Sequence, residues 1–205
     1  MQISMSSTAL GTSRRMLANL DHILDLGQAH AAARRIDPLV LTGDRLAPDM
    51  FPLRRQVQIA CDAVKNGLAR IAGVEAPKFE DSETGFEELR ERIRRTLAFV
   101  DIVPAARLDG TEDKPITFPV GKDATRTMAG FDYLTGWMLP NLFFHVTTAY
   151  NILRHCGVEL SKSDFLGAVP GAVMPGAPAK KGAAKKRAGE KKTAAAKKKP
   201  AAKVK

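Results

Sequence analysis

The sequence predicts a mainly α fold: a four-helix bundle with a small β-hairpin before the last helix, followed by a basic tail. Three observations support this prediction. Apolar residues recur at spacings of three and four in four segments. They alternate over a short stretch before the last of these segments. After residue 167 the composition changes to Ala, Lys, Pro and Gly. The 205 residues, 44% of them hydrophobic, suffice for one domain of 1–167 with an extension.

The first two predicted helices span about residues 7–33 and 50–72. We expect the first to end before Pro38, because a residue ahead of a proline avoids helical dihedrals. A loop should follow, and Asp49 should cap the second helix, which Gly73 ends. The apolar stripe of the first helix comprises Met16, Leu17, Leu20, Ile23, Leu24, Gly27 and Ala31.

The third helix is predicted to start at a capping box of Thr84 and Glu87 and to reach about residue 100. Its apolar repeat is Phe86, Leu89, Ile93, Leu97 and Val100. The hairpin should follow, because residues 116–120 alternate in polarity, Gly121 and Lys122 supply a turn, and residues 124–128 can return as a second strand. We expect the four helices to run antiparallel.

The last predicted helix, about residues 131–156, is apolar on nearly every face, which indicates burial. Pro140 should kink it near its start. One stripe is predicted to face the bundle and comprises Leu134, Met138, His145, Ala149 and Ile152. The residues on its other faces, Phe143, Phe144 and Val146, should be covered by the hairpin, by the loop before the second helix, or by another subunit.

The net charge of +10 is concentrated in residues 168–205, the basic tail. The tail carries +11, whereas residues 1–167 carry 20 basic and 21 acidic side chains. We expect the tail to be disordered and to bind DNA or RNA without reading bases, since its cations would displace counterions. A solubilising extension, or binding to acidic proteins, polymers or membrane surfaces, are the alternatives. Its cations are Lys180, Lys181, Lys185, Lys186, Arg187, Lys191, Lys192, Lys197, Lys198, Lys199, Lys203 and Lys205.

The lack of a secretory signal and the spacing of the two cysteines lead us to expect a cytoplasmic protein. The first 20 residues lack the apolar run of a secretory signal, and no stretch approaches the ~20 apolar residues of a membrane span. Cys61 and Cys156 have no CxxC spacing and should be reduced. We expect a cytoplasmic protein, associated with the nucleoid if the tail binds DNA.

Four strings carry a family resemblance: RLAPDMFPL at 45–53, QVQ at 56–58, FFHVTTAY at 143–150 and ILRH at 152–155. With them, residues 1–167 resemble an uncharacterised bacterial domain family related to the DinB/YfiT-like four-helix-bundle proteins. The resemblance implies a four-helix-bundle fold and a homodimer, but it implies no established activity. The tail lies outside it, and its composition is similar to histone-like proteins.

DinB-like proteins commonly bind a divalent metal through three histidines, two of them four residues apart on the last helix. By this resemblance the pair here is Asn141 and His145, and the second helix offers Gln56, Gln58 or Asp62 in place of the third histidine. A carboxamide is a poor transition-metal ligand, so the resemblance implies a degenerate site for a possible divalent cofactor.

His145 has two interpretations. It is either a neutral core histidine bonded to a neighbour such as Asn141, or a base or ligand in a bundle pocket, oriented by Asn141 or Tyr150. The first fits a non-enzymatic binding or structural protein. The second fits a small metal-assisted or His-dependent transferase or hydrolase. The sequence has neither a Gly-rich phosphate loop nor a nucleophile elbow.

Overall fold

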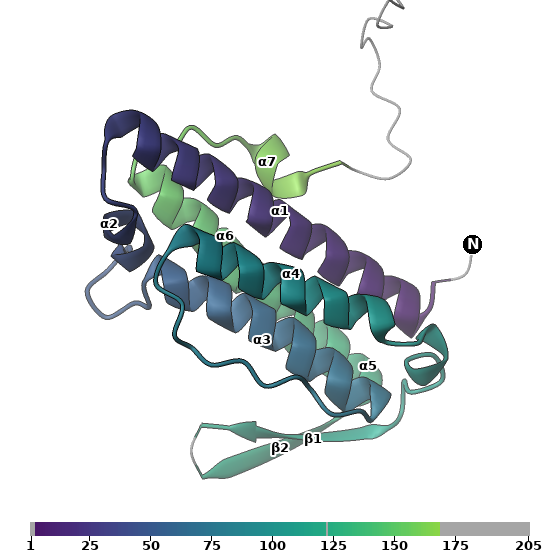
Figure 1. Ribbon diagram of the computed structural model, residues 1–205. Helices are drawn as coiled ribbons and strands as arrows, with labels where there is room; N and C mark the ends of the chain where they lie inside the picture. The colour runs from purple at the N-terminus through teal and green to yellow at the C-terminus, as the bar shows by residue number, and fades with distance from the viewer. Residues whose placement is uncertain (1–2, 122, 169–205) are drawn as a thin grey trace, which may run out of the picture. The chain divides into compact units, whose positions relative to one another are not determined.

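The computed structural model describes residues 3–121 and 123–168, so the tail predictions from residue 169 onward lie outside the described residues. Four long helices lie side by side (Figure 1), which confirms the predicted mainly α bundle. They are α1 (Met5–Arg34), α3 (Leu53–Ala72), α4 (Phe86–Ile102) and α6 (Leu139–His155). Shorter elements are α2 (Pro38–Gly43), η1 (Ala105–Arg107), β1 (Pro115–Val120), β2 (Ala124–Ala129), α5 (Gly130–Tyr133), η2 (Leu134–Met138) and α7 (Lys162–Leu166).

The bundle pairs its helices in two ways. Helix α1 runs antiparallel to α4, and α3 runs antiparallel to α6, but α3 and α4 run in the same direction (Figure 1). The prediction of four antiparallel helices is therefore wrong for the α3–α4 pair, and also for α1 and α6, which run in the same direction. The connection, residues 73–85, must travel back along α3, and we call it the strap. Thirteen extended residues can span about 43 Å, enough for the length of α3, about 30 Å.

Helix α2 occupies part of the segment predicted as a loop. Asp37 accepts a hydrogen bond from the Leu39 backbone N–H at 2.9 Å, and Pro38 stands at the first helical position. An acidic N-cap followed by proline starts a helix because the side chain satisfies an unpaired donor and proline has none to lose. That local signal outweighs the shortness of the segment.

The predicted caps of α3 and α4 are each misplaced. Asp49 does not cap α3; Pro52 stands at the N-cap without a side-chain bond, and the Leu53 N–H donates to the Asp44 carbonyl at 2.9 Å. In α4 the reciprocal acid is Glu88 instead of Glu87. Its carboxylate accepts from the backbone N–H groups of Thr84 at 2.6 Å and Gly85 at 3.1 Å, which lowers its pKa.

The predicted hairpin is confirmed. Strands β1 and β2 pair antiparallel, with Ile116 opposite Met128 and Phe118 opposite Arg126. Gly121 supplies the turn with φ +69°, which a glycine adopts without steric penalty. Ile116 and Phe118 are buried and fasten the hairpin to the core.

The last predicted helix is divided into α5, a π-helical segment η2 and α6. Pro140 has no N–H for the Gly136 carbonyl, and just before it the Leu139 N–H donates to the Leu134 carbonyl, five residues back. The helix therefore contains a π-helical turn just before Pro140, where the sequence predicts a kink.

The faces of this helix divide as predicted only in part. The stripe containing His145 is buried, and so is Val146. Phe143 and Phe144, however, are 37% and 59% exposed, so residues 3–121 and 123–168 cover these two rings only in part. Cover by another subunit stays a prediction.

Cys61 and Cys156 are free thiols. Within the described part of the chain, no helix is long and apolar enough to cross a bilayer.

Candidate functional site

The imidazole of His145 on α6 meets the carboxamide of Gln56 on α3. His145 Nδ1 lies 2.7 Å from Gln56 Oε1, and Gln56 Nε2 donates to the Phe51 carbonyl at 2.9 Å. The second bond orients the carboxamide, so its oxygen faces the ring. Nδ1 must therefore carry the proton and donate, which leaves Nε2 as the acceptor of the neutral ring.

Burial keeps this imidazole neutral. His145 is 8% exposed and Gln56 is 2% exposed. Desolvation, together with the nearby Arg55 charge, lowers the pKa of His145 from 6.5 to about 4. The Phe144 ring stands edge-on at 5.2 Å between centroids. His145 is therefore a neutral, hydrogen-bonded side chain at ordinary pH, whose partner is Gln56 instead of the expected Asn141.

The two residues predicted to orient His145 are engaged elsewhere. Asn141 Nδ2 donates to the Trp137 carbonyl one turn earlier, at 2.7 Å. The Tyr150 hydroxyl donates to the Leu160 carbonyl at 3.3 Å, and its ring meets Phe165 at 6.2 Å. Tyr150 thereby fixes the chain that follows α6. The structure brings neither side chain into a hydrogen bond with His145.

The residues offered for a metal do not fit a transition-metal site. Gln56, Asn141 and His145 supply one imidazole and two carboxamides, and Gln56 Oε1 already accepts from His145. Asp62 pairs with Arg92 and Lys65 instead. Across residues 3–121 and 123–168, no group of three His, Cys, Asp or Glu side chains gathers at metal-binding distance.

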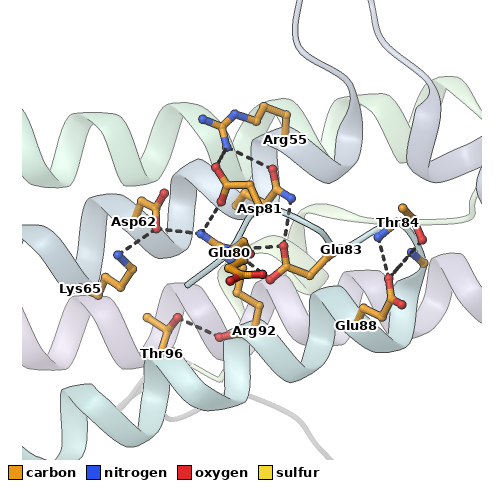
Figure 2. A network of polar contacts seen from close by, with 12 residues as sticks. Arg55, Asp62, Lys65, Glu80, Asp81, Glu83, Thr84, Glu88, Arg92 and Thr96 are labelled. Atoms are coloured by element: carbon orange, nitrogen blue, oxygen red, sulfur yellow. Dashed lines mark hydrogen bonds and ion pairs between the residues drawn. The ribbon is translucent and has the colours of Figure 1, made fainter. Parts of the chain in front are cut away.

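A second polar cluster, which the sequence did not indicate, centres on Arg92 of α4 (Figure 2). The Arg92 side chain is 1% exposed, and its guanidinium reaches both α3 and the strap. Nη2 lies 2.8 Å from Asp62 and 3.0 Å from Asp81, and Nη1 lies 3.0 Å from Glu83.

Helix α3 adds its own contacts to the strap. Arg55 pairs with Asp81, and Gln58 Nε2 donates to Glu83 at 3.0 Å. Arg55, Gln58 and Asp62 are spaced three and four residues apart, so one face of α3 meets the strap while Gln56 meets His145. This cluster holds the strap that the parallel α3–α4 pair requires.

Residues 5–166 match a family model described as "Domain of unknown function (DUF1993)". The chain belongs to the DUF1993 family. The match ends before the basic tail, so the DUF1993 domain is the bundle. A search of curated proteins finds no match.

The DUF1993 bundle is also similar to a solved structure, that of a DinB family member protein from Shewanella denitrificans. The two share 40% sequence identity with a TM-score of 0.75, over 82% of this chain and 95% of that one. The predicted resemblance to DinB-like bundle proteins is thus confirmed for the domain.

Proposed function

We propose that this DUF1993 protein is a non-enzymatic binding or structural protein whose basic tail binds DNA or RNA without sequence preference. One observation carries the proposal: residues 168–205 hold a charge of +11, whereas residues 1–167 are balanced to within a single charge. Nucleic-acid affinity would therefore reside in the tail, with the bundle as its carrier.

Counterion release supplies the binding free energy. Twelve cations stand against one acid, Glu190, and the segment contains no aromatic residue. Neutralised phosphates release condensed ions, and a protein with six to ten such contacts loses about 10³–10⁵ in affinity between about 50 and 200 mM salt. Without aromatic side chains, stacking on single strands contributes nothing.

The environment of His145 supports the non-enzymatic reading. Its Nδ1 proton is committed to Gln56, and burial keeps its pKa near 4, well below that of a general base at neutral pH. These features suit a core polar pair that fixes how α3 and α6 meet.

A homodimer in the cytoplasm completes the proposal. The exposed rings of Phe143 and Phe144 are apolar surface that a second copy would cover. Two copies would present two tails to one nucleic acid, which raises avidity without new contacts. Sedimentation of the whole protein tests the dimer.

The tail proposal is tested by fluorescence anisotropy with a labelled duplex at low salt. We compare the whole chain, a chain ending at Gly167, and a chain with the twelve tail cations changed to Gln. A variant with the eleven tail lysines changed to Arg is the matched control. We expect binding by the whole chain and the Arg variant only. Equal binding by the Gly167-terminated chain would refute the proposal.

An enzyme that uses His145 is the second candidate, because Nε2 stays available as an acceptor in a neutral ring. A His-dependent or metal-assisted transferase or hydrolase would place Asn141, His145 or Tyr150 at its centre. Elemental analysis of the purified protein discriminates between the non-enzymatic proposal and the metal-assisted form of the enzyme. A stoichiometric divalent metal that is lost in His145→Ala would favour the enzyme; the non-enzymatic proposal expects none.

A further inference from the structure

A cavity of about 150 Å³ lies between α3 and the last helix, where that helix becomes π-helical. Two sequence features shape it. Pro140 gives rise to the widened turn η2. Gly67 on α3 admits Met138, because a Cβ at position 67 would lie 2.6 Å from Met138 Cγ.

Two aromatic rings line the cavity and are held in place from behind. Trp137 packs on Phe118 at 5.0 Å between centroids, and the Tyr133 ring packs on Phe118 at 4.8 Å. The Tyr133 hydroxyl accepts from Arg70 Nη1 at 2.9 Å. The aromatic walls are thus ordered without any ligand, which limits the entropy lost on binding.

The polar groups of the lining are complementary to an amide. Asn66 Oδ1 accepts a hydrogen bond from Lys65 Nζ at 3.0 Å, and Asn141 Nδ2 donates a hydrogen bond to the Trp137 carbonyl. Both N–H donors of the Asn66 amide and the Oδ1 acceptor of Asn141 therefore have no partner among the described residues. The two charged lining residues, Asp62 and Arg70, are opposite in sign, so the lining is neutral overall.

We propose that this cavity binds a small, neutral, planar compound that carries an amide group. Aromatic walls favour a planar ligand, the two carboxamides favour a ligand that both accepts and donates a hydrogen bond, and the balanced charge disfavours an ion. A cavity of about 150 Å³ accommodates a benzene ring, which sets the size. The site is separate from the His145–Gln56 pair, neither of which lines it, and from the tail.

A larger recess beside α4, about 710 Å³, is a weaker candidate. Its lining is dominated by charged side chains of both signs, and several of them already pair with one another, such as Arg94 with Glu87 and Glu91. None of its lining residues is aromatic or aliphatic, in contrast to the cavity beside Trp137.

Three probes of one shape test the proposal: benzamide, benzoate and benzamidine, which are neutral, anionic and cationic. Trp137 is the single tryptophan of the chain, so its indole N–H gives one NMR signal from the cavity wall. We expect benzamide to shift this signal with millimolar affinity, and each ion to bind at least about fivefold more weakly, as the loss of one hydrogen bond implies. Equal binding of an ion, or no response to benzamide, overturns the proposal.

Variants of the whole chain locate the binding. Asn141→Leu and Asn66→Ala each remove one polar partner and should weaken benzamide binding about fivefold. Ala63→Leu should abolish it by filling the cavity. Asn151→Leu is the control, because Asn151 lies on the exposed face of α6, the helix that carries Asn141. This variant should leave benzamide binding unchanged. The affinity of a variant is compared only if its thermal unfolding stays cooperative, which shows that the variant is folded. Unchanged affinity in folded Asn66→Ala and Ala63→Leu would contradict the assignment.

Discussion

Arg92 and Asp62 join the parallel helices α4 and α3 through an ion pair in which Arg92 Nη2 lies 2.8 Å from the carboxylate. The Arg92 side chain is 1% exposed and that of Asp62 is 27% exposed. The same guanidinium bonds Glu83 of the strap. The side chain thus closes the contact between two helices and the segment that connects them.

Replacement of Arg92 by Met should reduce the free energy of unfolding by about 3–5 kcal/mol, because it leaves carboxylates without their buried partner. Urea unfolding followed by circular dichroism measures the loss. Arg94→Met, two residues along the same helix, is the matched control. Arg94 is 51% exposed, and its loss should change stability by less than about 1 kcal/mol. Equal effects of the two variants would show that the cluster does not hold the strap.

The stability of the bundle should fall as the pH drops from about 6.5 to about 4. The pKa of His145 is lowered from 6.5 to about 4 in the folded chain, so the unfolded chain binds the proton more readily over this window. A shift of this size contributes about 3 kcal/mol to the free energy of unfolding. This contribution is fully present above the pKa of His145 in the unfolded chain and is lost as the pH approaches 4. Urea unfolding at a series of pH values measures the slope. His145→Gln should flatten it, whereas His22→Gln, at an exposed position, should leave it steep.

The hydrogen bond between His145 and Gln56 should fix the Nδ1–H tautomer. Nitrogen chemical shifts of the imidazole report which nitrogen carries the proton. Gln56→Leu leaves the Nδ1–H without its acceptor and should reduce the free energy of unfolding by about 1–3 kcal/mol. An Nε2–H tautomer in the unmodified protein would contradict the orientation of Gln56 described above.

Two helical glycines should respond oppositely to replacement by alanine. In Gly67→Ala the new methyl would meet Met138, and overpacking of this kind reduces stability by about 1–3 kcal/mol. At Gly11 nothing lies within 4 Å of the new Cβ, so Gly11→Ala should stabilise α1 by up to about 1 kcal/mol. Thermal melts of both variants test the pair, and stabilisation by Gly67→Ala would show that Met138 does not pack against α3.

Local periodicity predicted the four long helices and the hairpin because burial of one face dictates their residue spacing. Helix starts were less accurate: several acids near position 84 compete for one cap, and only the backbone path decides that Glu88 takes it. The reversed direction of α4 was missed, since a 13-residue strap looks like any loop in the sequence.

The site could be predicted only as a set of residues. The sequence placed His145 on the inward stripe of the last helix, and the family resemblance offered Gln56 as one of three polar residues of the second helix. Their hydrogen bond joins residues 89 positions apart, so it depends on the register between α3 and α6. In the sequence, nothing distinguishes Arg92 from the solvent-facing arginines around it in the same helix. Its burial follows from the strap, which supplies two of its acidic partners, Asp81 and Glu83.

The salt dependence of duplex binding is the most direct test of the proposal that the tail, and not the bundle, binds nucleic acid. A tail that neutralises several phosphates predicts a steep linear fall of log K with log salt, with a slope of about −0.9 per phosphate. The chain ending at Gly167 should show neither the slope nor measurable affinity. A slope that survives this truncation would place the nucleic-acid contacts on the bundle and contradict the account.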